Sequence, residues 1–192
     1  MEDKRGLTKE LLAGSLRDLM MTTSFEKITI KMITDGANVI RPTFYKHFQD
    51  KYEVLEWIFQ KEVIEKIEVL IENNMEDEVI RLLCKRIGAN MEFYRQALKI
   101  EGPNSLYQIM NSSLYRCTLK IIKKHMLLLP KELDFLTVEQ IARFYTTSLT
   151  SILYDWILND SILSSEQMVS AYNYLTTKSI HEMINECVKK SL

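Results

Sequence analysis

Apolar residues recur at intervals of three and four along almost the whole chain, and this spacing restricts the fold more than any other feature. A helix completes a turn in about 3.6 residues, so such a spacing gathers the apolar side chains on one face. Glycine and proline interrupt helices, and the 192 residues contain only five glycines and three prolines. No segment alternates convincingly like a strand, and none repeats. The sequence therefore predicts an all-α protein.

The spacing predicts about eight to nine helices, with three short ones in the first fifty residues and a bundle of longer ones after them. Thr8, Thr29 and Asp50 stand where capping side chains would start helices. Asp50 is followed three residues later by Glu53, as in a capping box. The expected helices cover about 8–21, 30–38, 41–48, 50–72, 77–98, a stretch from Tyr107 to Ile121 that ends before Pro130, 137–159 and 165–189.

The charges separate a basic start from the rest of the chain. Residues 1–51 hold nine Lys and Arg against seven Asp and Glu, whereas residues 52–192 hold 16 against 19. This mild asymmetry suits a basic head on a neutral to acidic body. The sequence predicts two domains with these same boundaries.

The cysteines and the N-terminus indicate a cytoplasmic protein. Cys84, Cys117 and Cys187 are an odd number at wide spacing, which argues against a disulfide framework and favours core thiols. The first residues are charged and lack the apolar run of a signal peptide. No run approaches the roughly 20 apolar residues that would span a bilayer.

The sequence from Thr29 to Phe48 has the size and order of a helix-turn-helix, in which the second helix enters the major groove of DNA. Asn38 stands in the turn, where a left-handed residue is needed and asparagine tolerates that conformation. Pro42 is acceptable only in the first helical turn, where its missing N–H would have no partner in any case. The second helix therefore starts at or just before Arg41.

The stretch RPTFYKHFQDK, which begins at Arg41, carries the side chains that would meet DNA. Arginine can bind guanine through two hydrogen bonds, and threonine and proline can contact a thymine methyl. Phe44 and Phe48 are one turn apart and are expected to face the core. Lys51 starts the next long helix, whose free N–H groups favour a phosphate. The predicted base contacts are Arg41, Pro42 and Thr43, and the predicted phosphate contacts are Tyr45, Lys46, His47 and Lys51.

The series TFYKHFQDK, residues 43–51, resembles the TetR family of bacterial transcriptional regulators. Members typically begin this motif with threonine, then leucine or phenylalanine, then tyrosine. A basic or aromatic residue follows, then histidine or tyrosine, then phenylalanine, and the motif ends with a short polar turn and a lysine. The resemblance covers residues 7–60, and the helical pattern that follows fits the family's ligand-binding and dimerisation domain. It implies that a set of residues lines the DNA surface, namely Thr29, Arg41, Thr43, Tyr45, Lys46, His47 and Lys51.

Three positions depart from the family pattern. Asn38 replaces the usual glycine of the turn, and Pro42 replaces a residue that is commonly glycine. Ile40 stands where a serine cap is frequent, and the missing cap costs about 1 kcal/mol of local helix stability. Two other stretches, RPTFYKHFQDKYEVLEWIF and LYDWILNDSILSSEQM, resemble the branch that includes regulators of dihydroxyacetone kinase operons. This branch keeps activation by a partner protein open.

The last two expected helices are the predicted dimer interface. A palindromic operator requires a two-fold protein, and Thr137–Asn159 shows apolar residues on two faces, as a helix with two partners would. The family resemblance implies that Thr137–Asn159 and Ser165–Lys189 pair with their copies in a homodimer. It also implies an effector pocket, for which aromatic and methionine residues are candidates. The candidate lining residues are Met91, Tyr94, Tyr107, Met110, Tyr145 and Trp156.

An enzyme is not expected, and neither is a cofactor or a bound metal. The stretch HEMIN at His181 lacks the second histidine of the zinc-protease pattern, and no glycine-rich phosphate loop is present. The sequence thus predicts a dimeric operator-binding regulator modulated by a small-molecule effector. Two alternatives remain, an activator controlled by a partner protein and a helical interaction module without specific DNA binding. A steep salt dependence of DNA binding would separate the regulator from the module.

Overall fold

The computed structural model describes residues 4–125, 131–133, 135–159 and 163–190. These residues form eleven α-helical segments and no strand, which confirms the predicted all-α class. The helices are α1 Lys4–Met20, α2 Ile30–Gly36, α3 Arg41–Tyr45, α4 Lys51–Phe59, α5 Glu65–Glu72, α6 Val79–Ala89, α7 Met91–Leu98, α8 Leu106–Lys124, α9 Val138–Leu158, α10 Ser165–Thr177 and α11 Ile180–Lys190.

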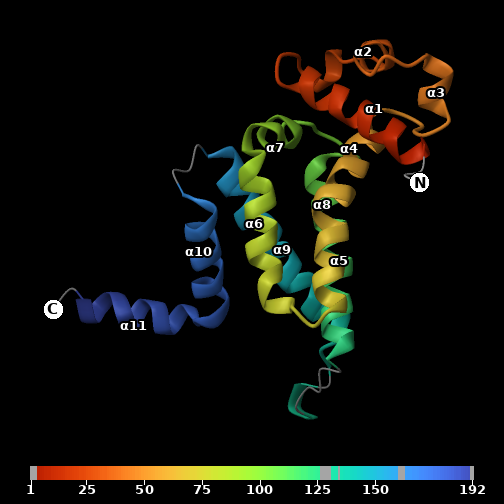
Figure 1. Cartoon of the computed structure of the whole chain (residues 1–192). Helices are drawn as coiled ribbons and strands as arrows, with labels where there is room; N and C mark the ends of the chain where they lie inside the picture. Colours follow the sequence, from red (N-terminus) through yellow and green to blue (C-terminus); the bar gives the residue numbers. More distant parts are fainter. Residues whose placement is uncertain (1–3, 126–130, 134, 160–162, 191–192) are drawn as a thin grey trace.

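The first three helices form a head at one end of the molecule (Figure 1). Helix α1 packs against α2 and α4, and the apolar centre of the head is continuous with the core of the body. The largest side chains in this centre are completely or almost completely buried, and they are Leu12, Leu16, Ile33, Phe44 and Phe48. The predicted group of three N-terminal helices is therefore confirmed.

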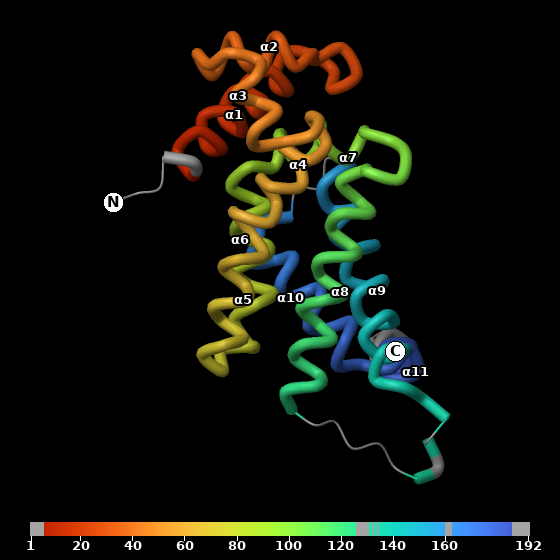
Figure 2. The backbone as a smooth tube through the Cα atoms, turned by 90° about the vertical axis from the view of Figure 1, so that its right-hand side faces the viewer, coloured from red at the N-terminus to blue at the C-terminus, as the bar shows by residue number. Residues whose placement is uncertain are grey.

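The remaining helices form an elongated body beneath the head (Figure 2). Helix α4 starts under the head and continues into the body through a π-helical turn, Gln60–Ile64, and then α5. Helices α8 and α9 are the most extensively packed pair, and α10 packs against α6. The boundary predicted between residues 51 and 52 falls in the first turn of α4, and the division into two domains stays a prediction.

Helix α1 begins one turn earlier than expected. Thr8 lies inside α1, so its predicted role as a helix cap is wrong. The preceding sequence continues the helix, and Gly6 is tolerated there. Leu11, which the spacing placed on the inward face, is 47% exposed, while its neighbours Leu12 and Ala13 are buried.

Three of the eight expected helices are each divided into two, which gives the eleven observed. The π-turn divides the expected helix 50–72 into α4 and α5, and breaks divide the other two. Asn90 separates α6 from α7, because its backbone angles of φ −129° and ψ 34° leave the helical region. Ser179 starts α11 with a reciprocal cap, in which the Glu182 N–H donates to Ser179 Oγ (3.2 Å) and the Ser179 N–H donates to Glu182 Oε2 (2.7 Å). Both breaks rest on local polar groups that the apolar spacing does not report.

Helix α11 extends from the end of α10 away from the other helices (Figure 1). Its apolar residues Ile180 and Ile184 are exposed, at 73% and 55%. Cys84 and Cys117 are buried as expected, whereas the side chain of Cys187 in α11 lies outside the described residues. None of the described helices combines the length and the apolar character that a membrane crossing requires.

Candidate DNA-binding face and effector cavity

The helix-turn-helix is built by local polar contacts. Thr29 caps α2, with its Oγ1 accepting from the Met32 N–H at 3.2 Å, as the sequence predicted. Asn38 has the left-handed φ of 53° that the turn requires. Gly36 allows α2 to approach α1 closely, since a Cβ at this position would lie 2.3 Å from Ser15 Oγ. The cap at Thr29 therefore fixes the start of α2, and Gly36 and Asn38 fix the turn that follows it.

Helix α3 is short and is held from beneath by aromatic residues. It begins at Arg41 with Pro42 in its first turn and has no side-chain cap from Ile40, as expected. It ends at Tyr45 rather than at Phe48, because the last turn tightens and the N–H groups of residues 47 and 48 both donate to the Phe44 carbonyl at 2.9 Å. The Phe44 and Phe48 rings are buried with centroids 5.9 Å apart.

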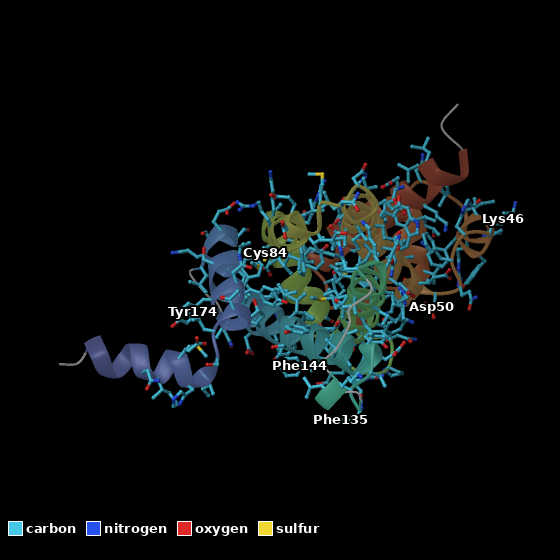
Figure 3. All side chains as sticks on the ribbon, turned by 90° about the horizontal axis from the view of Figure 1, so that it is seen from below. Lys46, Asp50, Cys84, Phe135, Phe144 and Tyr174 are labelled. Atoms are coloured by element: carbon cyan, nitrogen blue, oxygen red, sulfur yellow. The ribbon has the colours of Figure 1, made fainter. Side chains whose placement is uncertain are left out.

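The outer side of α3 carries polar side chains in contact with water. Arg41, Pro42, Tyr45 and Lys46 are exposed, and a terminal nitrogen of Arg41 lies 3.4 Å from the Tyr45 hydroxyl. The half-buried Thr43 and His47 lie on the same short segment. We name the surface made by residues 41–43 and 45–47 the reading face. Figure 3 shows Lys46 at the end of the molecule opposite Tyr174 of α10.

Lys51 does not share the reading face with the other predicted contacts. Its ammonium donates to three backbone carbonyls at the start of the helix-turn-helix, those of Phe25 (2.6 Å), Glu26 (3.2 Å) and Ile28 (2.9 Å). It also lies 4.5 Å from the centre of the Phe25 ring. Burial lowers the pKa of Lys51, and Glu26 opposes this shift. An ammonium has three protons to donate, so Lys51 ties the start of α4 to the loop before α2.

A partly buried ion pair joins the head to the body. Arg17 of α1 donates to Glu62 in the π-turn, and its guanidinium lies over the Phe93 ring of α7. Burial raises the pKa of Glu62, although the Arg17 charge and hydrogen bond act in the opposite direction. The pair therefore links three helices at the point where α4 changes to α5.

The body contains a cavity of about 770 Å³ that is lined by residues of α6, α8, α9 and α10 and of the turns before α6 and α9. Its wall is mostly apolar, and Glu76 and Asp77 are the charged residues among the described lining. The lining residues are Glu76, Asp77, Val79, Ile80, Leu114, Cys117, Thr118, Ile121, Ile122, Leu136, Gln140, Ile141, Phe144, Tyr145, Leu149 and Tyr172. This volume is in the usual range for small-molecule sites, about 300–1,000 Å³.

The six candidate pocket residues are not brought together. Tyr145 lines this cavity, whereas Tyr94, Met110 and Trp156 are buried core residues. The Trp156 indole N–H donates to the Leu163 carbonyl at 2.9 Å. The remaining two candidates, Met91 and Tyr107, are partly buried against the core. The sequence contained a better signal, because the apolar stripes of α8 and α9 that form the wall were visible in it.

Glu76 holds the end of the cavity through several contacts. Its Oε1 accepts from Lys124 Nζ at 2.8 Å and lies 3.2 Å from His125 Nε2. Lys124 also donates to the Ile71 carbonyl at the end of α5. The hydrogen bond from Lys124 is the largest cause that lowers the pKa of Glu76 to about 2. We name Glu76, Lys124 and His125 the polar clasp, since they connect the α5–α6 turn to the end of α8.

Helices α9, α10 and α11 each carry exposed apolar side chains, which we together name the apolar face. A shallow groove along α9 is bordered by Phe144, Ile152 and Leu175, with the small residues Thr147, Ser148 and Ser151 between them. Phe144 is 68% exposed and Leu175 is 50% exposed. A single large exposed side chain is ordinary on a protein surface, but a continuous patch indicates a contact with another molecule.

Comparison with known proteins places the chain among transcriptional regulators. Residues 73–178, more than half of the chain, match the TetR_C_8 family, described as the transcriptional regulator C-terminal region. The HTH-type dhaKLM operon transcriptional activator DhaS of Lactococcus lactis is 29% identical over 99 residues. This match spans 50% of the chain and about half (51%) of the relative's length.

Two solved structures share the fold. The dihydroxyacetone kinase operon activator DhaS matches with a TM-score of 0.64 at 22% identity, over 88% of this chain and 93% of that one. FadR of Thermus thermophilus, a TetR family repressor solved in complex with lauroyl-CoA, matches with a TM-score of 0.61 at 14% identity, over 90% and 94%. The expected resemblance to the dihydroxyacetone kinase operon branch is thus confirmed, and the chain belongs to the TetR family of transcriptional regulators.

Proposed function

We propose that the chain binds a palindromic operator as a homodimer, with one α3 helix in the major groove of each half-site. The reading face carries this proposal, because it is exposed and polar on a helix that buried aromatic residues hold from beneath. Half-sites of helix-turn-helix dimers lie about 34–36 Å apart, so the two reading faces must be held at a fixed distance. A cytoplasmic location follows from access to the chromosome.

Each residue of the reading face has a distinct role in this proposal. Arg41 and Thr43 select bases, and Pro42 contributes an apolar contact to them. Tyr45, Lys46 and His47 hold the phosphates, which orient the protein without selecting a sequence. Thr29 fixes the first helix of the pair through its cap and, as an exposed residue, forms part of the DNA-binding surface in this proposal. Lys51 acts indirectly by setting the angle between the head and α4.

The dimer forms through the exposed face of α9 and α10, and α11 extends the same surface. The small residues of the α9 groove allow a second helix to approach closely, and Phe144 and Leu175 supply apolar area around them. Ile180 and Ile184 of α11 add exposed apolar side chains beyond the groove. A second copy would remove all of these from water, which is the main driving force for stable association.

An effector occupies the cavity of the body and shifts the protein between two arrangements of its heads. The cavity supports this step, since its volume and apolar wall suit a small molecule. The FadR relative was solved with lauroyl-CoA, and the DhaS relative is an activator. Activation through a partner protein is the second candidate, favoured by the match to DhaS.

The first test is fluorescence anisotropy with DNA from upstream of the chain's own gene and with a scrambled duplex, in a series of salt concentrations. Operator binding predicts a preference for the upstream DNA, which Arg41→Ala weakens, together with a steep loss of affinity as salt rises. Lys66→Ala, an exposed change on α5, is the matched control and should leave binding unchanged. Equal, weak binding of both duplexes, followed by no enriched sequence in a genome-wide selection, would contradict the proposal.

A further inference from the structure

The charges around the cavity are distributed unevenly. Among its described lining residues, Glu76 and Asp77 are acidic and none is lysine or arginine. An apolar wall has little capacity to solvate a charge, so the sign of the charges at the mouth decides which charged ligands enter. A carboxylate or phosphate on a ligand would meet Asp77 there, together with a Glu76 carboxylate that is already paired with Lys124.

The lysines near the mouth do not reverse this effect, because each is paired with a glutamate. The last two turns of α8 carry these lysines. The pairs are Lys120 with Glu72 at 3.2 Å, Lys123 with Glu139 at 2.9 Å and Lys124 with Glu76 at 2.8 Å. Asp77 forms no ion pair with a described residue. Among the described lining residues, Asp77 is therefore the carboxylate without an ion-pair partner.

The polar clasp places the second carboxylate at the same mouth. Glu76 is only 17% exposed, and the same Lys124 that binds it also reaches the last turn of α5. The low pKa of about 2 keeps Glu76 ionised at any physiological pH. Asp77 is exposed and unpaired, so a cation could bind it without displacing another described group, whereas it would have to compete with Lys124 for the half-buried Glu76.

We propose that the cavity binds an amphiphile with an apolar chain and a cationic head group, which lies between Asp77 and Glu76 and displaces Lys124. This inference rests on the proposed effector-controlled function and specifies its ligand class. The aromatic rings of Phe144, Tyr145 and Tyr172 in the wall add faces on which a cation is attracted. The apolar chain would lie along the stripe of α8 that ends at Ile121.

Displacement of Lys124 connects ligand binding to the head. Lys124 joins the end of α8 to the Ile71 carbonyl, and α5 is continuous with the π-turn that holds Arg17. Release of the clasp frees α5 at its far end. The ligand favours the arrangement in which the clasp is open, and it changes operator affinity by that preference alone.

Three ligands with the same ten-carbon chain test the charge preference, namely decyltrimethylammonium, decanol and decanoate. Isothermal titration calorimetry of the whole protein, below the critical micelle concentrations, should give affinities in that order. We expect at least about a tenfold difference between the cation and the anion. Decanoate that binds as tightly as decyltrimethylammonium would overturn the proposal, and so would the absence of binding by all three.

Variants identify the groups responsible. Asp77→Asn with Glu76→Gln should remove the preference for the cation while decanol still binds, and Glu101→Gln, an exposed acid outside the cavity lining, should leave it intact. Lys124→Met should strengthen binding of the cation. Circular dichroism checks that each variant is folded. A charge preference that survives the double substitution would contradict the assignment.

The same experiment separates this inference from the proposed function. Operator affinity is measured first without ligand. If the protein does not bind the operator, the proposed regulatory function is refuted, while the preference of the cavity for a cation can still be tested. Cation binding that leaves operator affinity unchanged would overturn the coupling through Lys124. If a second copy occupies the cavity instead, decyltrimethylammonium will bind only to a monomeric variant, and this outcome also refutes the ligand assignment.

Discussion

The reading face of the head and the apolar face of α9–α11 are both exposed, but they are stabilised in different ways. On the reading face, Arg41 and Lys46 extend into water, and the hydrophobic side of the same helix is buried through Phe44. On the apolar face, Phe144 and Leu175 are themselves the exposed hydrophobic groups. The polar side chains of the reading face are stable in contact with water. Covering the apolar face with another surface would lower the free energy, because it removes apolar side chains from water.

This difference assigns a type of partner to each face. Hydrated cations exchange water for phosphates with little change in the fold, so their partner can be bound and released as salt or effector changes. Large apolar side chains fit a lasting protein contact. The two faces lie on different parts of the molecule, as the labels Lys46, Phe144 and Tyr174 show (Figure 3). In the proposed dimer, the contact between the two apolar faces would set the distance between the two reading faces.

The largest effect is expected when the apolar face is made charged. The double substitution of Phe144→Glu and Leu175→Glu should weaken dimerisation by at least about 100-fold, because each large apolar side chain contributes about 1.5–3 kcal/mol when buried. Sedimentation velocity over a dilution series measures the change. Val69→Glu alters an equally exposed apolar residue on α5 and serves as the control. A double variant that remains dimeric at low concentration would place the interface elsewhere.

The next largest effect is expected on the reading face. Arg41→Ala should lower affinity for the operator by about 5- to 150-fold, corresponding to about 1–3 kcal/mol for a lost bidentate contact to guanine. Affinity for a scrambled duplex should change much less. Competition binding against operators with single base changes locates the affected position. If the variant loses affinity for every sequence equally, Arg41 contacts the backbone and not a base.

A comparison of Lys51 and Lys46 should distinguish a lysine that stabilises the fold from a lysine that contacts DNA. Lys51→Met should lower the free energy of unfolding by about 1–3 kcal/mol, since three carbonyls lose a charged donor. Lys46→Ala should leave thermal stability unchanged and should reduce the salt slope of DNA binding by about one. Calorimetry and anisotropy on both variants test this. Unchanged stability of Lys51→Met together with a smaller salt slope would restore Lys51 as a phosphate contact.

The smallest effect is expected at the polar clasp. The folded-state pKa of Glu76, about 2, lies below its ordinary value of 4.5, so its contribution to stability is present above about pH 4.5 and is lost as the pH falls toward 2. Glu76→Gln should therefore flatten the decline of the melting temperature between pH 5 and 3. Glu101→Gln is the matched control. Equal slopes for both variants would show that the clasp does not contribute to acid sensitivity.

Sequence patterns predicted the head well because its determinants are local. The cap at Thr29, the left-handed Asn38 and the start of α3 near Pro42 each depend on a few neighbouring residues. The carbonyl contacts of Lys51 could not be predicted in this way, and its phosphate contact stays a prediction. Its position at a helix start suggested a phosphate contact, but three carbonyls some 23 to 26 residues away in sequence bind its ammonium. No spacing rule reports that contact.

The cavity was less predictable because it depends on how helices are placed in space. Tyr94 and Trp156 have the side chains of ligand-binding residues, but the fold buries both in the core. The wall is instead formed by ordinary apolar stripes, such as the one that includes Ile121, where four helices fail to fill the space between them. Composition identifies residues that could line a pocket, and only packing decides which of them do.

The π-turn at Gln60–Ile64 also restricts how the length of the chain can vary. A π-turn accommodates one residue more than an α-helical turn, and one residue corresponds to a rotation of about 100° around a helix axis. Deletion of one residue in this segment would restore a regular helix, but it would turn the head relative to the body and separate Arg17 from Glu62. Insertions and deletions should therefore be excluded here, even though many single substitutions on the exposed side of the same helix would be accepted.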